Sequence, residues 1–200
     1  MKKVVEKIQR ILNESIMKNH MASMIVSGGS SPTNLLHNLN NLEIEWQKVK
    51  VMLLDERLVD ESHRHSNEKY LKENFFKKWS KNAQYQSIRS LEIDKTIDLA
   101  ILGFGTDGHF ASIFPCHLNV DEFININRDP MILKTNKMGD PHVSRLTLNL
   151  SAFLCVRNIF IIINSEEKKH IFDEAKHNKE LPIYHLLKLK NINIEALKDF

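Results

Sequence analysis

Apolar residues recur through the first part of the chain with the spacing of one face of a helix. They are Val4, Val5, Ile8, Ile11, Leu12 and Ile16. This pattern predicts an amphipathic helix that ends near Asn19 and His20. Similar patterns predict helices at residues 32–39, 67–79 and 165–175. Ser66 is expected to cap the second of these, while Asn164 and Glu167 have the spacing of a capping box for the third.

Short, nearly continuous apolar runs lie between the helical patterns. They predict buried strands at Ser23–Ser27, Val49–Leu54, Asp98–Gly103 and Asn158–Ile163. Apolar strands that alternate with helices are typical of parallel pairing. The sequence therefore predicts an α/β fold, a three-layer, doubly wound, mainly parallel Rossmann-like sheet with helices on both faces.

One stretch departs from this alternation. Residues 116–144 contain Pro130, Gly139 and Pro141 and have little periodicity, so we expect them to form an excursion from the sheet. The chain has no internal repeat, low-complexity segment or linker, and residues 1–200 are expected to form a single domain.

Composition narrows the class of protein. Of the 200 residues, 42% are hydrophobic and 26% are charged, as in a soluble globular domain. The formal net charge of +3 is spread without long blocks of one sign, which argues against a nucleic-acid partner. No apolar run is long enough to cross a membrane, so no membrane partner is expected either.

Two features bear on location in the cell. Cys116 and Cys155 fit neither a CxxC motif nor a zinc spacing, so free thiols in a reducing compartment are expected. The N-terminal segment contains Glu6 and Glu14 and lacks the unbroken apolar region of a signal peptide. We therefore expect a cytoplasmic protein.

Ligands of doubly wound sheets bind at the carboxyl ends of the strands. Polar segments follow each predicted strand there, at residues 27–32, 55–57, 103–109 and 164–168. The first reads S-G-G-S-S-P, in which Ser31 suits a helix N-cap and Pro32 the first helical position. Such a corner could point several backbone N–H groups at an anion, although an ordinary strand-to-helix turn has the same composition.

The segment G-F-G-T-D-G-H-F-A-S-I-F-P at residues 103–115 carries the strongest signal. Its glycines permit a tight turn that delivers His109 and Asp107 to the end of a strand. A neutral imidazole accepts protons near neutral pH, and a nearby carboxylate can hold its tautomer. The pair could therefore activate water, whereas an isolated histidine is more often structural.

Two cations follow other predicted strands. Arg57, in the segment D-E-R, could present its guanidinium to a phosphate or a developing oxyanion, or it could simply pair with a local acid. Lys168 falls in the first turn of a predicted helix, where the macrodipole disfavours a cation. That placement suggests an anion site, but a solvated lysine fits the sequence equally well.

Two further clusters contain residue types that can bind metals or act as nucleophiles. The segment D-E-S-H-R-H at residues 60–65 mixes histidines and acids but lacks a recognisable ligand spacing, so a solvated connector is favoured over a metal site. The adjacent Cys116 and His117 suggest a thiol nucleophile, yet neighbours in sequence rarely adopt nucleophile and base geometry.

Taken together, the segments resemble the 6-phosphogluconolactonase family, within the larger group that includes glucosamine-6-phosphate deaminases. The family motifs occur in order as Ser27–Pro32, Asp55–Arg57, Ser66-Asn67, Gly103–Pro115, Arg145–Thr147 and Glu166–Lys168. The resemblance spans roughly residues 22 to 185 and implies a fold of the sugar-phosphate isomerase type. Ser165 and Thr106 replace a glycine and a proline that are common in the family.

The resemblance implies hydrolysis of 6-phospho-D-glucono-1,5-lactone to 6-phosphogluconate in the oxidative pentose phosphate pathway, without a cofactor or metal. His109 matches the family's general base, and Asp107 matches the carboxylate beside it. The implied substrate contacts are Gly28, Gly29, Ser30, Ser31, Asp55, Arg57, Arg145 and Lys168. The motif of Arg145 could equally support the fold.

The sequence is compatible with two other functions. Related deaminases carry an acidic residue shortly after the histidine, where this chain has Phe114 before Pro115. Phenylalanine cannot shuttle a proton, which favours the lactonase over a deaminase or isomerase. A non-catalytic sugar-phosphate sensor would keep the cations and the glycine-rich loop, but it has no evident need for the pair of Asp107 and His109.

Overall fold

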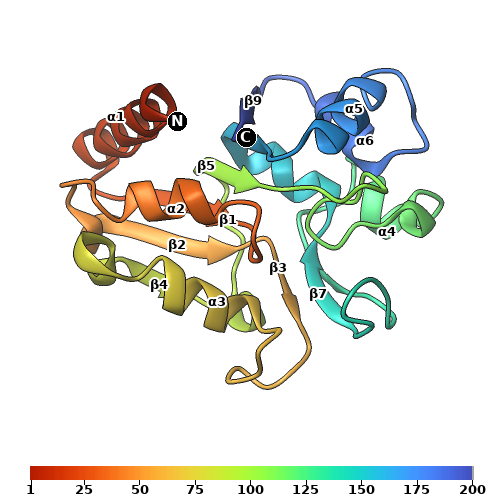
Figure 1. Cartoon of the computed structure of the whole chain (residues 1–200), viewed down its shortest axis with the longest axis horizontal. Helices are drawn as coiled ribbons and strands as arrows, with labels where there is room; N and C mark the ends of the chain where they lie inside the picture. The colour runs from red at the N-terminus through yellow and green to blue at the C-terminus, as the bar shows by residue number, and fades with distance from the viewer. Residues whose placement is uncertain (200) are drawn as a thin grey trace.

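The computed structural model describes residues 1–199, and a six-stranded parallel sheet forms their centre (Figure 1). Its strands are β1 (Ala22–Val26), β2 (Val49–Leu53), β4 (Gln84–Gln86), β5 (Ile97–Leu102), β8 (Val156–Ile163) and β9 (Asn193–Lys198), in the order β4-β2-β1-β5-β8-β9. Four of these strands are the predicted apolar runs, within two residues at either end.

The order of the strands reverses at β1. The chain first builds outward from β1 through β2 to β4, and then returns to place β5 on the other side of β1. In the register of the sheet, Val26 lies beside Leu53 of β2 and Ile101 of β5. Open α/β sheets form a crevice beyond the carboxyl ends of the strands at such a switch point. The loops that follow β1 and β5 flank it.

Helices cover both faces of the sheet, as predicted. On one face lie α1 (Lys2–Asn19), α2 (Thr33–Leu39) and α3 (Asn67–Asn74), and on the other lie α5 (Glu166–Glu174) and α6 (Pro182–Leu187). Successive strand residues point to opposite faces: Met24 and Val26 belong to one buried cluster, and Ile25 belongs to the other. One buried cluster lies on each face of the sheet, between the strands and the helices that cover them. The fold therefore has three layers.

A smaller antiparallel sheet extends from the central one. It consists of β3 (Asp55–Arg57), β7 (Arg145–Leu148) and β6 (Ile132–Lys134), in the order β3-β7-β6. Leu54 joins the sheets, because its N–H donates to Val26 and its carbonyl accepts from Leu148. Residues 116–144 lie outside the central sheet, as expected, and contain β6 and the short helix α4 (Asp121–Ile124). Short 3₁₀ helices occur at Trp46–Lys48, Lys78–Asn82, Ile88–Ser90, Pro115–His117 and Leu150–Cys155.

The structure corrects three details of the predicted helices. The helix expected to reach residue 79 ends at Asn74, because the chain turns where Phe75 packs edge-on against Trp46, 5.4 Å between ring centroids. Ser165, rather than Asn164, caps α5 by accepting the Lys168 N–H at 3.1 Å.

The third correction concerns the turn after β1. The helix begins at Thr33, with Pro32 in the capping position and no side-chain cap from Ser31. The Ser31 hydroxyl instead accepts a hydrogen bond from the Lys168 amine at 3.0 Å. Its partner is therefore a cation from a distant part of the chain.

None of the helices within residues 1–199 combines the length and the apolar character that a membrane crossing needs. Nor does the described chain gather three His, Cys, Asp or Glu side chains in the manner of a metal site.

Candidate active site

A cavity of about 230 Å³ opens at the switch point of the sheet. It is lined by Ser27, Gly28, Gly29, Ser30, Ser31, Asp55, Arg57, Asn67, Gly103, Phe104, Gly105, His109, Ala111, Arg145 and Lys168. All eight residues expected to contact a substrate are in this set, as is His109. Segments far apart in the sequence thus converge on one space.

Asp107 lies beside His109 rather than in the cavity wall. Its Oδ1 atom is 2.5 Å from His109 Nδ1 and also accepts the His109 backbone N–H at 3.1 Å. Burial raises the pKa of the Asp107 carboxyl, but the hydrogen bonds and charge of His109 outweigh it and hold that pKa below its ordinary value. An ionised carboxylate only accepts hydrogen bonds, so Nδ1 carries the imidazole proton and Nε2 keeps a free electron pair.

Glycines make this arrangement possible. A Cβ atom on Gly105 would overlap the His109 ring and come within 2.6 Å of Asp107 Oδ1. Gly108 has φ of +77°, a left-handed conformation that favours glycine. The Gly105 N–H donates to the His109 carbonyl at 2.8 Å, which closes the turn. The turn therefore leaves room for the paired side chains.

Two arginines are paired on adjacent strands of the small sheet. Arg57 and Arg145 are directly opposite in the antiparallel register of β3 and β7, and both line the cavity. Like charges in this position destabilise a sheet. Burial lowers the pKa of Arg145, and within the described chain neither Nε atom has a hydrogen-bond partner. An anion in the cavity would offset this repulsion.

Asn67 is a residue of the site that the sequence analysis did not single out as a contact. Its Oδ1 atom accepts from Arg57 Nη1 at 2.5 Å, and its Nδ2 donates to the Asp55 carbonyl at 2.9 Å. A Cβ atom on Gly28 would overlap the Asn67 side chain, so the loop after β1 packs directly on it. The signal in the sequence was the pair Ser66-Asn67 at the start of a helix.

Asp55 is buried at the edge of the cavity with both carboxylate oxygens engaged. Oδ2 accepts from the Ser112 hydroxyl at 2.6 Å, and Oδ1 accepts from Asn67 at 3.3 Å. These contacts tie together β3, the start of α3 and the segment that follows His109. Asp55 therefore fixes its neighbours as well as lining the cavity.

Lys168 comes from the first turn of α5, where the Ser165 cap places it. Its amine donates to Ser31 and lies 5.7 Å from the centre of the Phe104 ring. Burial lowers the pKa of Lys168, and the charge of Glu167 partly opposes the change. A half-buried cation beside the S-G-G-S-S loop provides a second position for an anion.

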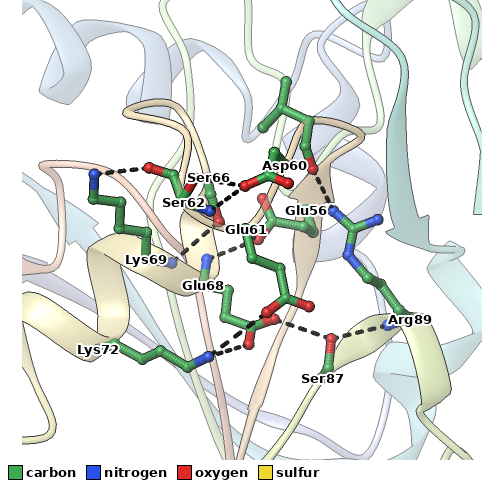
Figure 2. A network of polar contacts seen from close by, with 11 residues as sticks. Glu56, Asp60, Glu61, Ser62, Ser66, Glu68, Lys69, Lys72, Ser87 and Arg89 are labelled. Carbon is green, nitrogen blue, oxygen red and sulfur yellow. Dashed lines mark hydrogen bonds and ion pairs between the residues drawn. The ribbon is translucent and has the colours of Figure 1, made fainter.

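Glu56 anchors the segment that carries Asn67. Its buried carboxylate accepts the backbone N–H groups of Arg57, Asn67 and Glu68 at 2.6–2.7 Å. Burial raises its pKa, although these hydrogen bonds and one from Ser66 pull it the other way. Figure 2 shows this anchor at the start of α3, continued by contacts of Glu68 with Lys72 and Ser87.

The two clusters set aside in the sequence have other contacts. In residues 60–65 the rings of His63 and His65 are 5.3 Å apart, and the His65 carbonyl accepts from Arg57 at 3.1 Å. Cys116 is exposed, while the buried His117 uses Nδ1 to accept the Phe114 N–H at 3.1 Å. His117 is thus engaged with the backbone rather than with the thiol.

Comparison with known proteins identifies similar sequences. A family model described as glucosamine-6-phosphate isomerases/6-phosphogluconolactonase matches residues 1–193. A 6-phosphogluconolactonase of Helicobacter pylori is 30% identical, over 98% of this chain and 91% of the relative. One from Neisseria meningitidis is also 30% identical, over 86% of this chain and 82% of the relative.

Solved structures agree with the sequence matches. The crystal structure of a 6-phosphogluconolactonase from Shewanella baltica superposes with a TM-score of 0.85 at 25% identity, covering 98% of this chain and 91% of the other. That of the Thermotoga maritima enzyme gives 0.82 at 25% identity, covering 99% and 94%. The α/β fold is therefore that of these enzymes.

The role of Glu56 as an anchor can be tested by stability. Glu56→Ala leaves three buried N–H groups and one hydroxyl without their acceptor, and we expect the free energy of unfolding to fall by about 3 kcal/mol. Urea denaturation measures this loss. Glu61→Ala, which removes an exposed glutamate 4.0 Å from Lys72 in the loop after β3, should change stability by less than about 0.5 kcal/mol. Equal losses in the two variants would contradict the assignment.

Proposed function

The chain belongs to the family of glucosamine-6-phosphate isomerases and 6-phosphogluconolactonases, and we propose that it hydrolyses 6-phospho-D-glucono-1,5-lactone with His109 as the general base. The observation that carries this proposal is the pair of His109 and Asp107 at a cavity lined with three cationic side chains. The names of the relatives support the same reaction.

The reaction begins with a water molecule held near His109 Nε2. As the water oxygen bonds to the lactone carbonyl carbon, Nε2 takes one of its protons, and Asp107 stabilises the imidazolium that forms. The carbonyl oxygen becomes an oxyanion, which the positive charge around the cavity stabilises. The bond from the carbonyl carbon to the ring oxygen then breaks, and His109 returns the proton to that oxygen. The product is the open-chain 6-phosphogluconate.

The charges of the cavity suit a phosphorylated substrate. We assign the phosphate to the loop of Gly28–Ser31 together with Lys168, because the lysine amine already contacts that loop. Arg57 and Arg145 add positive charge that a dianion or an oxyanion would balance. The partner of this protein is thus a small sugar-phosphate lactone.

A deaminase or isomerase reaction would need an acid where Phe114 stands. The Phe114 ring stacks on the His109 imidazole at 4.5 Å between centroids and has no group that can transfer a proton. This contact favours the lactonase. We also infer a cytoplasmic location, which the free thiols of Cys116 and Cys155 support.

The first prediction concerns the base. His109→Ala should lower the enzymatic rate of lactone opening by at least about 100-fold, because general-base catalysis typically contributes that much. The measurement uses lactone freshly generated from glucose 6-phosphate, with the spontaneous rate subtracted. His177→Ala removes an exposed histidine outside the cavity and should keep wild-type activity. A folded His109→Ala variant with near-normal turnover would refute the mechanism.

If the wild-type protein binds the lactone without accelerating its opening, a sensor function replaces the enzyme. If it instead releases ammonia from glucosamine 6-phosphate, the protein is a deaminase. These two assays separate the three functions that the sequence left open.

The second prediction concerns pH. Since burial lowers the pKa of Lys168 below the ordinary lysine value of 10.5, its charge is lost at a lower pH than that of an exposed lysine. An amine loses its charge as pH rises, so binding of 6-phosphogluconate should weaken on the alkaline side, beginning below pH 10.5. Isothermal titration calorimetry between pH 7 and 10 measures the affinity of this stable product.

Lys168→Met should bind weakly and show little change over that pH range. Lys169→Met removes the adjacent lysine, which pairs with Glu166 outside the cavity, and should retain the wild-type profile. The assignment fails if Lys168→Met keeps both the affinity and its alkaline decline.

A further inference from the structure

Phe114 contacts two functional side chains of the cavity without lining it. Its ring stacks on His109 with an interplanar angle of 24°, and the Arg145 guanidinium lies 5.4 Å from the centre of the same ring. Phe114 is only 7% exposed and is not part of the cavity wall. The ring therefore lies behind the residues that line the cavity.

Phe114 is itself held from two directions. The Phe114 backbone N–H donates to His117 Nδ1, and the His117 ring stacks on Phe123 with 3.9 Å between ring centroids. On another side, a Cβ atom placed on Gly139 would lie only 2.8 Å from the tip of the Phe114 ring. The phenyl group has little space in which to turn, so it presents a fixed flat surface to His109.

A fixed surface is what the imidazole needs beyond its carboxylate partner. The hydrogen bond to Asp107 holds Nδ1 but permits the ring to pivot about the line that joins the two atoms. A flat ring stacked on one face blocks that pivot. Misplacing a reacting group by about 1 Å can lower a rate by 10²-fold, so restricting the pivot matters for catalysis.

We propose that Phe114 is a positioning residue of the lactonase reaction: its ring fixes the plane of the His109 imidazole so that Nε2 faces the bound lactone. The same ring also positions the Arg145 guanidinium. Phe114 therefore positions both the base and one cation. This inference rests on the proposed function. It goes beyond it by giving a role to a side chain that lies behind the residues lining the cavity.

The test compares Phe114→Leu with the wild type in the lactone assay. Leucine keeps much of the apolar volume but has no flat face. We expect kcat to fall about tenfold while KM stays within about twofold, because the substrate contacts remain. Phe75→Leu breaks another buried aromatic pair, the one with Trp46, which does not line the cavity, and should leave both constants unchanged.

A spectroscopic measurement separates positioning from simple core packing. In protein labelled at histidine, the ring protons of His109 are identified by their loss in His109→Gln. Stacking on Phe114 shifts these protons upfield, and Phe114→Leu should move them downfield while Phe75→Leu does not. In the wild type, nuclear Overhauser effects should connect the two rings. This last measurement needs no variant to fold.

The outcomes distinguish the two proposals. A wild-type protein that does not accelerate lactone opening contradicts the proposed function, whatever the spectra show. An active wild type with unchanged kcat in folded Phe114→Leu contradicts the role of Phe114 alone. A loss confined to KM, unmoved His109 resonances, or the absence of ring-to-ring Overhauser effects also overturns it.

Discussion

The parallel pairing of β1 with strands on both of its sides is the constraint on which the rest of the structure depends. Backbone hydrogen bonds continue it past the strand ends, from the Ser27 N–H to Ile101 and from the Leu54 N–H to Val26. They bring the S-G-G-S-S loop, the D-E-R strand and the histidine turn to one edge of the sheet. The cavity is the space that remains between segments held apart by their own strands.

Cationic side chains are concentrated around this cavity, and neighbouring polar residues hold them in place. Arg57 and Arg145 are paired on adjacent strands, and Lys168 is half buried in the wall of the same cavity. The Arg57 guanidinium donates a hydrogen bond to the Asn67 side-chain oxygen, and Glu56 anchors Asn67 through its backbone N–H, so Arg57 is held in an arrangement that the bare charges would not favour. A site of this kind is preorganised for an anion, since its reorganisation was completed when the chain folded.

The sequence was informative where one local pattern decides the outcome. Continuous apolar runs identified four central strands, and glycine spacing with Asp107 and His109 indicated the turn in which these two side chains pair. Strands β4 and β9 were missed because their edge positions leave many residues exposed. The pairing of Arg57 with Arg145 and the stacking of Phe114 on His109 were not predictable, because tertiary packing sets each of them.

The cavity draws its side chains from the first loop after β1 through to the start of α5, so most of the polypeptide must be in place before it exists. Such a site depends on non-local contacts, each of which costs loop-closure entropy to form. A chain that ends before α5 lacks the lysine that contacts the loop after β1. The full set of cavity side chains therefore comes together only in the complete fold.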